Sequence, residues 1–126
     1  MFKFDKGVLK PPQLINLDNL RILARENEAF IREILEVYLA NTPKDLDNMA
    51  IAVKDRDWKV IRYYAHKLKS SSFTIGFSEG HQKFETIEQM IRNEEYSDVI
   101  DQLFAESLTS CDACLVEVSK ELTKYV

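Results

Sequence analysis

The scarcity of helix-breaking residues is the feature that most constrains the fold of this chain. Its 126 residues include only three glycines and three prolines, and two of the prolines are adjacent at Pro11 and Pro12. The stretches without breakers are rich in Leu, Ile, Ala, Glu and Lys, which favour helices. Because the length is that of a single domain, the chain is predicted to form one all-α domain around one core.

The N-terminal part of the sequence divides into a leader and the start of the domain. Residues 1–13 carry three lysines and the proline pair, so they are predicted to lie on the surface or to remain loose. The helical domain is predicted over residues 14–126. Asn16 can cap a short first helix that holds Leu17, Leu20, Ile22 and Leu23.

A second apolar series at helical spacing runs from Phe30 to Leu39, and a third follows from Leu46 to Val53. Pro43 lies between them, and proline disturbs the helix that precedes it. Either Thr42 caps a new helix or one long helix is kinked near Pro43, and we prefer the kinked helix.

Three further helices are predicted after this one. Asp57 is a suitable N-cap for a helix with Ile61, Ala65, Leu68, Ser72 and Ile75 inside, which Gly76 ends or loosens. Ser78 and Glu79 start the next, and the last holds Val99, Leu103, Leu108, Leu115, Val118 and Leu122. Short loops make neighbouring helices antiparallel, so the prediction is an up-down-up-down four-helix bundle with a short extra N-terminal helix.

Charge and hydropathy exclude several classes of protein. The net charge of -4 argues against nucleic acid or an anionic membrane as the partner. No apolar run approaches the ~20 residues that span a bilayer, and the N-terminus lacks the apolar core of a signal peptide, so a cytoplasmic location is predicted. A basic patch is nevertheless expected between Lys54 and Lys69, where six Lys or Arg residues occur.

The two cysteines form an isolated C-x-x-C pair at Cys111 and Cys114 within the last predicted helix. A zinc site needs further ligands, and a thioredoxin-like site needs a βαβ context. Neither is present in the sequence. We therefore interpret them as ordinary helix residues in a reducing compartment, with a redox or metal site as the alternative.

His66 is the strongest candidate for chemistry. Counted from the predicted buried series, it falls about 100° round the helix, on the side of Arg62, Lys69, Ser70 and Phe73. An exposed imidazole is largely uncharged near neutral pH and is a good nucleophile. The neighbouring cations could offset the charge of an added phosphoryl group. The alternative is an incidental histidine on a solvated helix face.

The segment from Ala65 to Phe77 reads AHKLKSSSFTIGF and resembles the signature of histidine-containing phosphotransfer (HPt) domains, roughly A-H-x-L-K-G-S-x-x-x-x-G. The motif lies within a predicted helix, and the flanking helices have the lengths and order expected of the whole domain. The matching residues are Ala65, His66, Leu68, Lys69, Ser71 and Gly76.

The resemblance implies roles for individual residues. His66 would accept the phosphoryl group through Nε2, and Lys69 would lie beside that group. The family often has Gln on the following helix to bind the imidazole; Glu88 occupies the comparable place, either as an orienting group or as an exposed carboxylate. Ser70 stands where the family usually has Gly, and as a small residue it would leave room for a docking partner.

The leading functional hypothesis is a phosphorelay intermediate. His66 would take a phosphoryl group from a receiver-domain phospho-aspartate, or from a histidine kinase in trans, and pass it to another receiver aspartate. The expected partners are response-regulator receivers or a hybrid sensor histidine kinase. The chain is expected to be a monomer with no cofactor or metal of its own, because Mg²⁺ and the acidic pocket would belong to the receiver.

Other functional classes remain open at this stage. An autophosphorylating kinase is disfavoured because Lys67 follows His66 where such kinases have an acidic residue, and no nucleotide-binding motif is present. A metal site would rest on His66 and His81 without a third ligand. The main alternative is a non-catalytic helical adaptor in which His66 is incidental. Partner identity and the direction of phosphoryl flux are not predicted.

Overall fold

The structure, a computed structural model, describes residues 13–125, and within them all regular structure is helical. The elements are α1 (Asp18–Leu23), α2 (Glu28–Lys54), α3 (Trp58–Thr74), α4 (Ser78–Arg92), α5 (Asp98–Leu122) and a terminal 3₁₀ turn, η1 (Thr123–Tyr125). The prediction of an all-α chain with four substantial helices and a short N-terminal helix is confirmed. The predicted leader lies, except for Gln13, outside the described residues.

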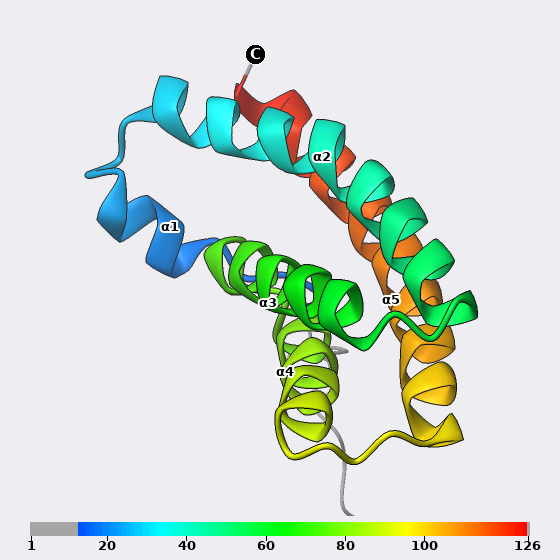
Figure 1. Cartoon of the computed structure of the whole chain (residues 1–126). Helices are drawn as coiled ribbons and strands as arrows, with labels where there is room; N and C mark the ends of the chain where they lie inside the picture. The colour runs from blue at the N-terminus through cyan, green and yellow to red at the C-terminus, as the bar shows by residue number, and fades with distance from the viewer. Residues whose placement is uncertain (1–12, 126) are drawn as a thin grey trace, which may run out of the picture.

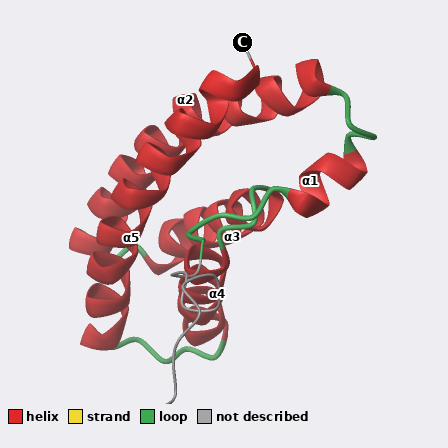
Figure 2. Ribbon diagram, turned by 180° about the vertical axis from the view of Figure 1, so that it is seen from behind, coloured by secondary structure: helices red, strands yellow, loops and turns green. Residues whose placement is uncertain are grey.

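The four long helices form the bundle. Each of α2, α3 and α4 packs against the helix that follows it, and α5 returns to pack against α2. The two longest helices lie side by side and run in opposite directions (Figure 1). Seen from behind, α3 and α4 pack together on the concave side of the curved α2 and α5 (Figure 2). None of the helices in residues 13–125 is both long and apolar enough to cross a membrane.

Helix α2 is continuous through Pro43, as the kinked-helix interpretation predicted. Figure 1 shows it curved along its length. Pro43 is on the exposed side of the helix, so water can satisfy the carbonyl that loses its helical donor.

The predicted N-caps Asp57 and Asn16 differ in outcome. Asp57 caps α3 as predicted, since its side chain accepts a hydrogen bond from the Val60 amide. The N-cap of α1 is Leu17 rather than Asn16. Asn16 still contributes, because its side-chain oxygen accepts a 2.9 Å hydrogen bond from the Asp18 amide. The prediction was therefore wrong by one position, although the capping group is the predicted one.

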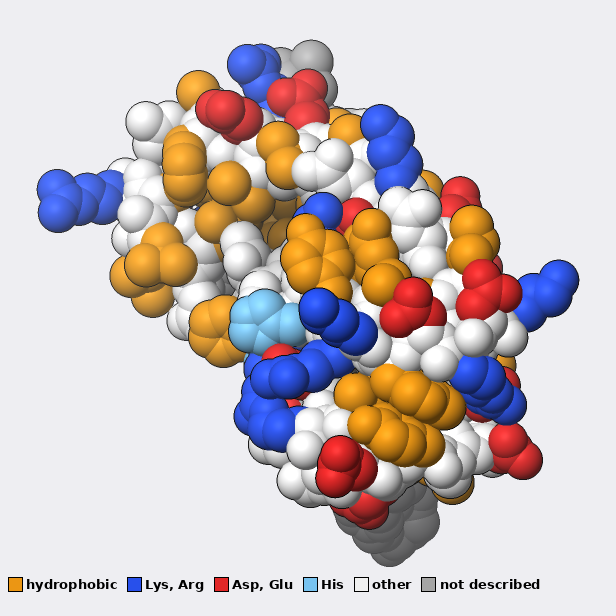
Figure 3. All heavy atoms as spheres, viewed as in Figure 1, with side chains coloured by type: hydrophobic (Ala, Val, Ile, Leu, Met, Phe, Trp, Pro, Cys, Tyr) orange, Lys and Arg blue, Asp and Glu red, His pale blue; other side chains and the backbone are white. Residues whose placement is uncertain are grey.

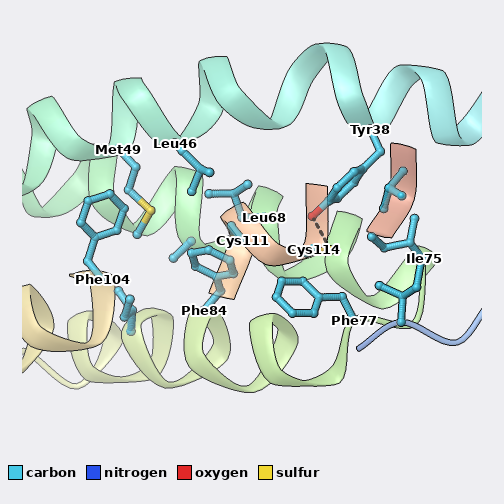
Figure 4. Close-up of a cluster of buried hydrophobic side chains, with 14 of the residues drawn as sticks. Tyr38, Leu46, Met49, Leu68, Ile75, Phe77, Phe84, Phe104, Cys111 and Cys114 are labelled. Atoms are coloured by element: carbon cyan, nitrogen blue, oxygen red, sulfur yellow. Dashed lines mark hydrogen bonds between the residues drawn. The ribbon is translucent and has the colours of Figure 1, made fainter. Parts of the chain in front are cut away.

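The core lies between the four long helices and is filled by aliphatic, aromatic and cysteine side chains (Figure 4). The predicted inner face of α3 is confirmed. On α5 the predicted series is partly confirmed: Val118 is buried, and Leu103, Leu108, Leu115 and Leu122 are partly buried against the core. Val99 was wrong, because it is exposed, and the prediction missed the buried residues Ile100, Phe104, Ser107, Cys111 and Cys114. Each fully buried aliphatic or phenyl side chain contributes about 1.5–3 kcal/mol to folding.

Cys111 and Cys114 are completely buried, free thiols. Figure 4 shows Cys114 opposite Tyr38 of α2, and its sulfur lies 3.5 Å from the tyrosine hydroxyl. Burial raises the pKa of the Cys111 thiol to about 12 and that of Cys114 to about 11. The two cysteines are therefore unreactive core residues, more deeply buried than the sequence interpretation required.

Candidate functional site

The exposed face of α3 positions His66. The buried residues Ile61, Ala65, Leu68 and Ser72 fix the rotation of the helix, because all four face the core. His66 follows the buried Ala65 and so projects from the bundle, with 62% of its side chain exposed. Its predicted exposure is thus confirmed.

Glu88 reaches His66 from the neighbouring helix. It lies on the inner side of α4, and only 4% of its side chain is exposed. One carboxylate oxygen, Oε2, is 2.9 Å from Nδ1 of the His66 ring. The alternative of an exposed helix carboxylate is excluded by this burial.

Two cations complete the environment of the Glu88 carboxylate. Nζ of Lys69 is 2.7 Å from its Oε1, and a guanidinium nitrogen of Arg92 is 3.1 Å from its Oε2. Burial acts to raise the pKa of Glu88, but the hydrogen bonds from Lys69 and His66 outweigh that effect and lower the pKa below its ordinary value. The carboxylate is therefore ionised at neutral pH.

Arg92 was not identified from the sequence. It is four residues after Glu88 on α4, a spacing at which opposite charges are neighbours on a helix. The spacing alone could have predicted the pair of Glu88 and Arg92, but it indicates a role for Arg92 only when Glu88 is known to contact His66.

A shallow cleft surrounds the His66 ring. Ser70 is exposed one turn beyond His66 and forms part of the cleft wall, and its role in docking stays a prediction. The cleft is lined by Arg62, Tyr63, His66, Lys67, Ser70, Glu88 and Arg92. Figure 3 shows a face of the molecule on which a histidine is bordered by Lys and Arg side chains, with hydrophobic side chains close by.

Lys67 links this cleft to a second hollow. Its Nζ lies 3.0 Å from Asp45 of α2, a carboxylate that is almost wholly buried. The hollow, of about 210 Å³, lies between α2 and α3 and is lined by residues such as Ile34, Val37 and Ile75. The basic patch predicted from the sequence is therefore partly neutralised, because Lys67 pairs with Asp45 and Lys69 pairs with Glu88.

The other predicted features of this region are placed as follows. Phe73 is 60% exposed, and its ring lies 5.6 Å from that of His81 on α4. Nδ1 of His81 is 3.3 Å from the Lys69 carbonyl oxygen, so this ring contacts α3 through the backbone rather than through Glu88. In residues 13–125 no group of three or more His, Cys, Asp or Glu side chains is placed to hold a metal ion.

Comparison with protein families identifies the domain. The family model described as the Hpt domain matches residues 33–123, which is most of the chain from early α2 to the end of α5. The chain belongs to the Hpt domain family. This membership supports a phosphotransfer role in two-component signalling. Searches of curated proteins and of solved structures gave no match.

Within the Hpt domain, the family motif covers the middle and end of α3 and the turn that follows. Gly76 of the motif has φ of +68°, in the left-handed region that favours glycine. A Cβ atom at this position would lie 1.8 Å from the backbone oxygen of Asn16. The motif glycine therefore lets residues before α1 cross the α3–α4 turn at close range.

Proposed function

We propose that this Hpt domain is a phosphorelay intermediate that carries the phosphoryl group on Nε2 of His66. The observation that supports the proposal best is the pairing of an exposed imidazole with a buried, ionised carboxylate. His66 is accessible to a macromolecular partner, whereas Glu88 behind it is not.

The hydrogen bond to Glu88 favours one tautomer of the ring. An ionised carboxylate can only accept hydrogen bonds, so Nδ1 of His66 must donate. The lone pair then resides on Nε2, which has no hydrogen-bond partner among residues 13–125. Nε2 is therefore the nucleophilic atom of the neutral ring.

The proposed donor is a receiver domain that bears a phospho-aspartate. The Nε2 lone pair attacks phosphorus, the bond between phosphorus and the aspartate oxygen breaks, and the aspartate leaves as a carboxylate. The receiver supplies Mg²⁺ and its acidic pocket. A second receiver aspartate later takes the phosphoryl group from Nε2. The alternative donor is a hybrid sensor histidine kinase, which would phosphorylate His66 in trans.

Charges around the ring favour such a partner. Arg62, Lys67 and Arg92 line the cleft that contains His66. Lys67 and Arg92 pair with Asp45 and Glu88, but the three cations still outnumber these two carboxylates. Complementary charge steers an acidic surface to a basic one and accelerates encounter. A single chain supplies the imidazole, the carboxylate and the cations, so we propose that the monomer is sufficient for transfer.

The test is transfer from a phosphorylated receiver to the purified domain. The wild type should acquire acid-labile, base-stable phosphate, and His66→Gln should acquire none. His81→Gln is the matched control, because His81 is the other histidine of the chain, and this variant should be labelled normally. Label on His66→Gln but not on His81→Gln would move the acceptor to His81.

His66→Ala should lose labelling in the same way while remaining folded, because the side chain is exposed and Ala is an excellent helix former. Absence of label from the wild type with every receiver of the source organism would favour the adaptor hypothesis instead.

A further inference from the structure

The immediate surroundings of His66 include a full negative charge, and this charge must act on the phosphorylated state as well as on the free ring. Glu88 offers both carboxylate oxygens to the site: Oε2 faces Nδ1 of His66 and Oε1 faces Lys69. An amide in the same place could accept a hydrogen bond from Nδ1 but would carry no charge.

The charge on the ring follows from the atom balance of phosphorylation. When neutral His66 attacks through Nε2, the proton on Nδ1 stays in place, so the product ring carries a positive charge. Water can then attack phosphorus in an exchange that breaks the P–Nε2 bond. If Nδ1 keeps its proton, the ring leaves as neutral imidazole with the bonding electron pair on Nε2; without that proton it would have to leave as an anion.

We propose that Glu88 makes the phosphohistidine of this domain short-lived at neutral pH, by holding the proton on Nδ1 of the phosphorylated His66 ring. The proposal rests on the proposed function, since it needs His66 to be the acceptor. It adds a regulatory property to that site: the domain loses its phosphoryl group to water unless a receiver takes it promptly, and so does not store it.

The other charged groups near the ring weaken the effect of Glu88 without cancelling it. They are Arg62, Lys67, Lys69 and Arg92, with Tyr63 as the further titratable group in the cleft. Lys67 is turned toward Asp45, and Lys69 and Arg92 both contact Glu88 itself. Glu88 is the one carboxylate among the residues that line this cleft, and it is the group in direct contact with Nδ1.

Lys69 adds a second reason for a short lifetime. The family resemblance places this lysine beside the phosphoryl group, where its charge would stabilise phosphohistidine. In the structure its Nζ lies 2.7 Å from Glu88, and the lysine side chain is only 22% exposed. A phosphoryl group on Nε2 must therefore compete with a buried carboxylate for this cation.

The experiment measures the decay of phosphohistidine against pH without a protein partner. Wild type and Glu88→Gln are loaded chemically with phosphoramidate, freed of reagent, and followed by ³¹P NMR between pH 5 and 9.5. An opposite charge in contact shifts a titration by about one to three pH units. Decay of Glu88→Gln should therefore reach its half-maximal rate at least about one pH unit lower than the wild type, and should be about tenfold slower at pH 8.

Two more variants make the comparison specific. Glu85→Gln removes a carboxylate from the exposed side of α4, where it faces His81 rather than His66, and should leave the decay profile unchanged. Arg92→Gln removes a cation that partly neutralises Glu88. It should therefore move the pH at which decay is half-maximal in the opposite direction, to higher pH. Because Arg92 is half exposed, this variant remains informative if Glu88→Gln fails to fold.

The possible failures are distinguishable. If phosphoramidate does not label His66 at all, the proposed function fails. If His66 is labelled but wild type and Glu88→Gln decay with the same pH profile, or if Arg92→Gln shows no upward shift, only the role of Glu88 in the lifetime is overturned.

Discussion

The carboxylate of Glu88 lies 2.9 Å from Nδ1 of His66, although the two residues are 22 positions apart on successive helices. The carboxylate is buried and the imidazole is exposed, so a protected group orients a reactive one. The pair also connects α3 to α4 at the proposed docking site. Changes to the residues around it are expected to separate folding from phosphoryl transfer.

Lys69→Ala should slow phosphoryl transfer from a receiver by about tenfold to a hundredfold, since it removes a cation next to the site where charge accumulates. It should also reduce the free energy of unfolding by about 1–3 kcal/mol, because Glu88 loses a charged hydrogen bond in a buried position. Lys69→Arg should retain more activity.

The matched control for Lys69→Ala is Lys83→Ala. Lys83 has a similarly covered side chain and pairs with Glu106 of α5, away from His66. Transfer rates should be measured by rapid quench. Equal rates for Lys69→Ala and Lys83→Ala would show that Lys69 has only a structural role.

Ser70→Gln should slow transfer and weaken receiver binding sharply, because it adds bulk to the cleft wall one turn from His66. Its melting temperature should change little, since Ser70 is exposed and Gln is a good helix former. Ser70→Gly should cost only a few tenths of a kcal/mol and should transfer at least as fast as wild type.

Ser119→Gln adds the same bulk on an exposed position of α5 and serves as the control for Ser70→Gln. Binding is measured by titration calorimetry with a receiver. Normal binding and transfer by Ser70→Gln would place the docking surface elsewhere, even with His66 as the acceptor.

Acidification should destabilise the wild type more than Glu88→Gln. The folded-state pKa of Glu88 is lowered, so its contribution to stability is fully present above the ordinary value of 4.5 and is lost as the pH falls through the folded-state pKa. Wild type should be more stable than Glu88→Gln by about 1–3 kcal/mol at pH 7. Urea unfolding between pH 7 and 3 should show this difference shrinking below pH 4.5; a constant difference would contradict the assignment.

Gly76→Ala should reduce the free energy of unfolding by about 2 kcal/mol or more. The positive φ alone costs a residue with a side chain about 1–2 kcal/mol, and the new methyl group meets the Asn16 backbone. Gly76→Asn separates the two causes, because Asn tolerates positive φ but also has a Cβ. Near wild-type stability of Gly76→Asn in denaturant titrations would mean that the contact with Asn16 contributes little.

The sequence by itself determined the helices and the acceptor candidate. Apolar spacing located the core face of α3 because one helix can be counted from its own buried residues, and the same count placed His66 on the outside. On α5 the same spacing misplaced Val99 and missed the most deeply buried positions: Val99 and Leu103 are apolar, as are Ile100 and Phe104, so periodicity alone admits two adjacent faces. Only packing against α2 and α4 selects between them.

Only the tertiary structure decided the environment of the histidine. The sequence places Glu88 four residues after Phe84 and three before Ile91, on the apolar side of α4, but it does not show that the carboxylate meets His66. The packing of α4 against α3 buries this carboxylate. It also gathers Lys69 and Arg92 on it. The charges around His66 depend on contacts between residues that are far apart in the sequence. The sequence gives the types of these residues, but only the packing of the helices gives the distances between them.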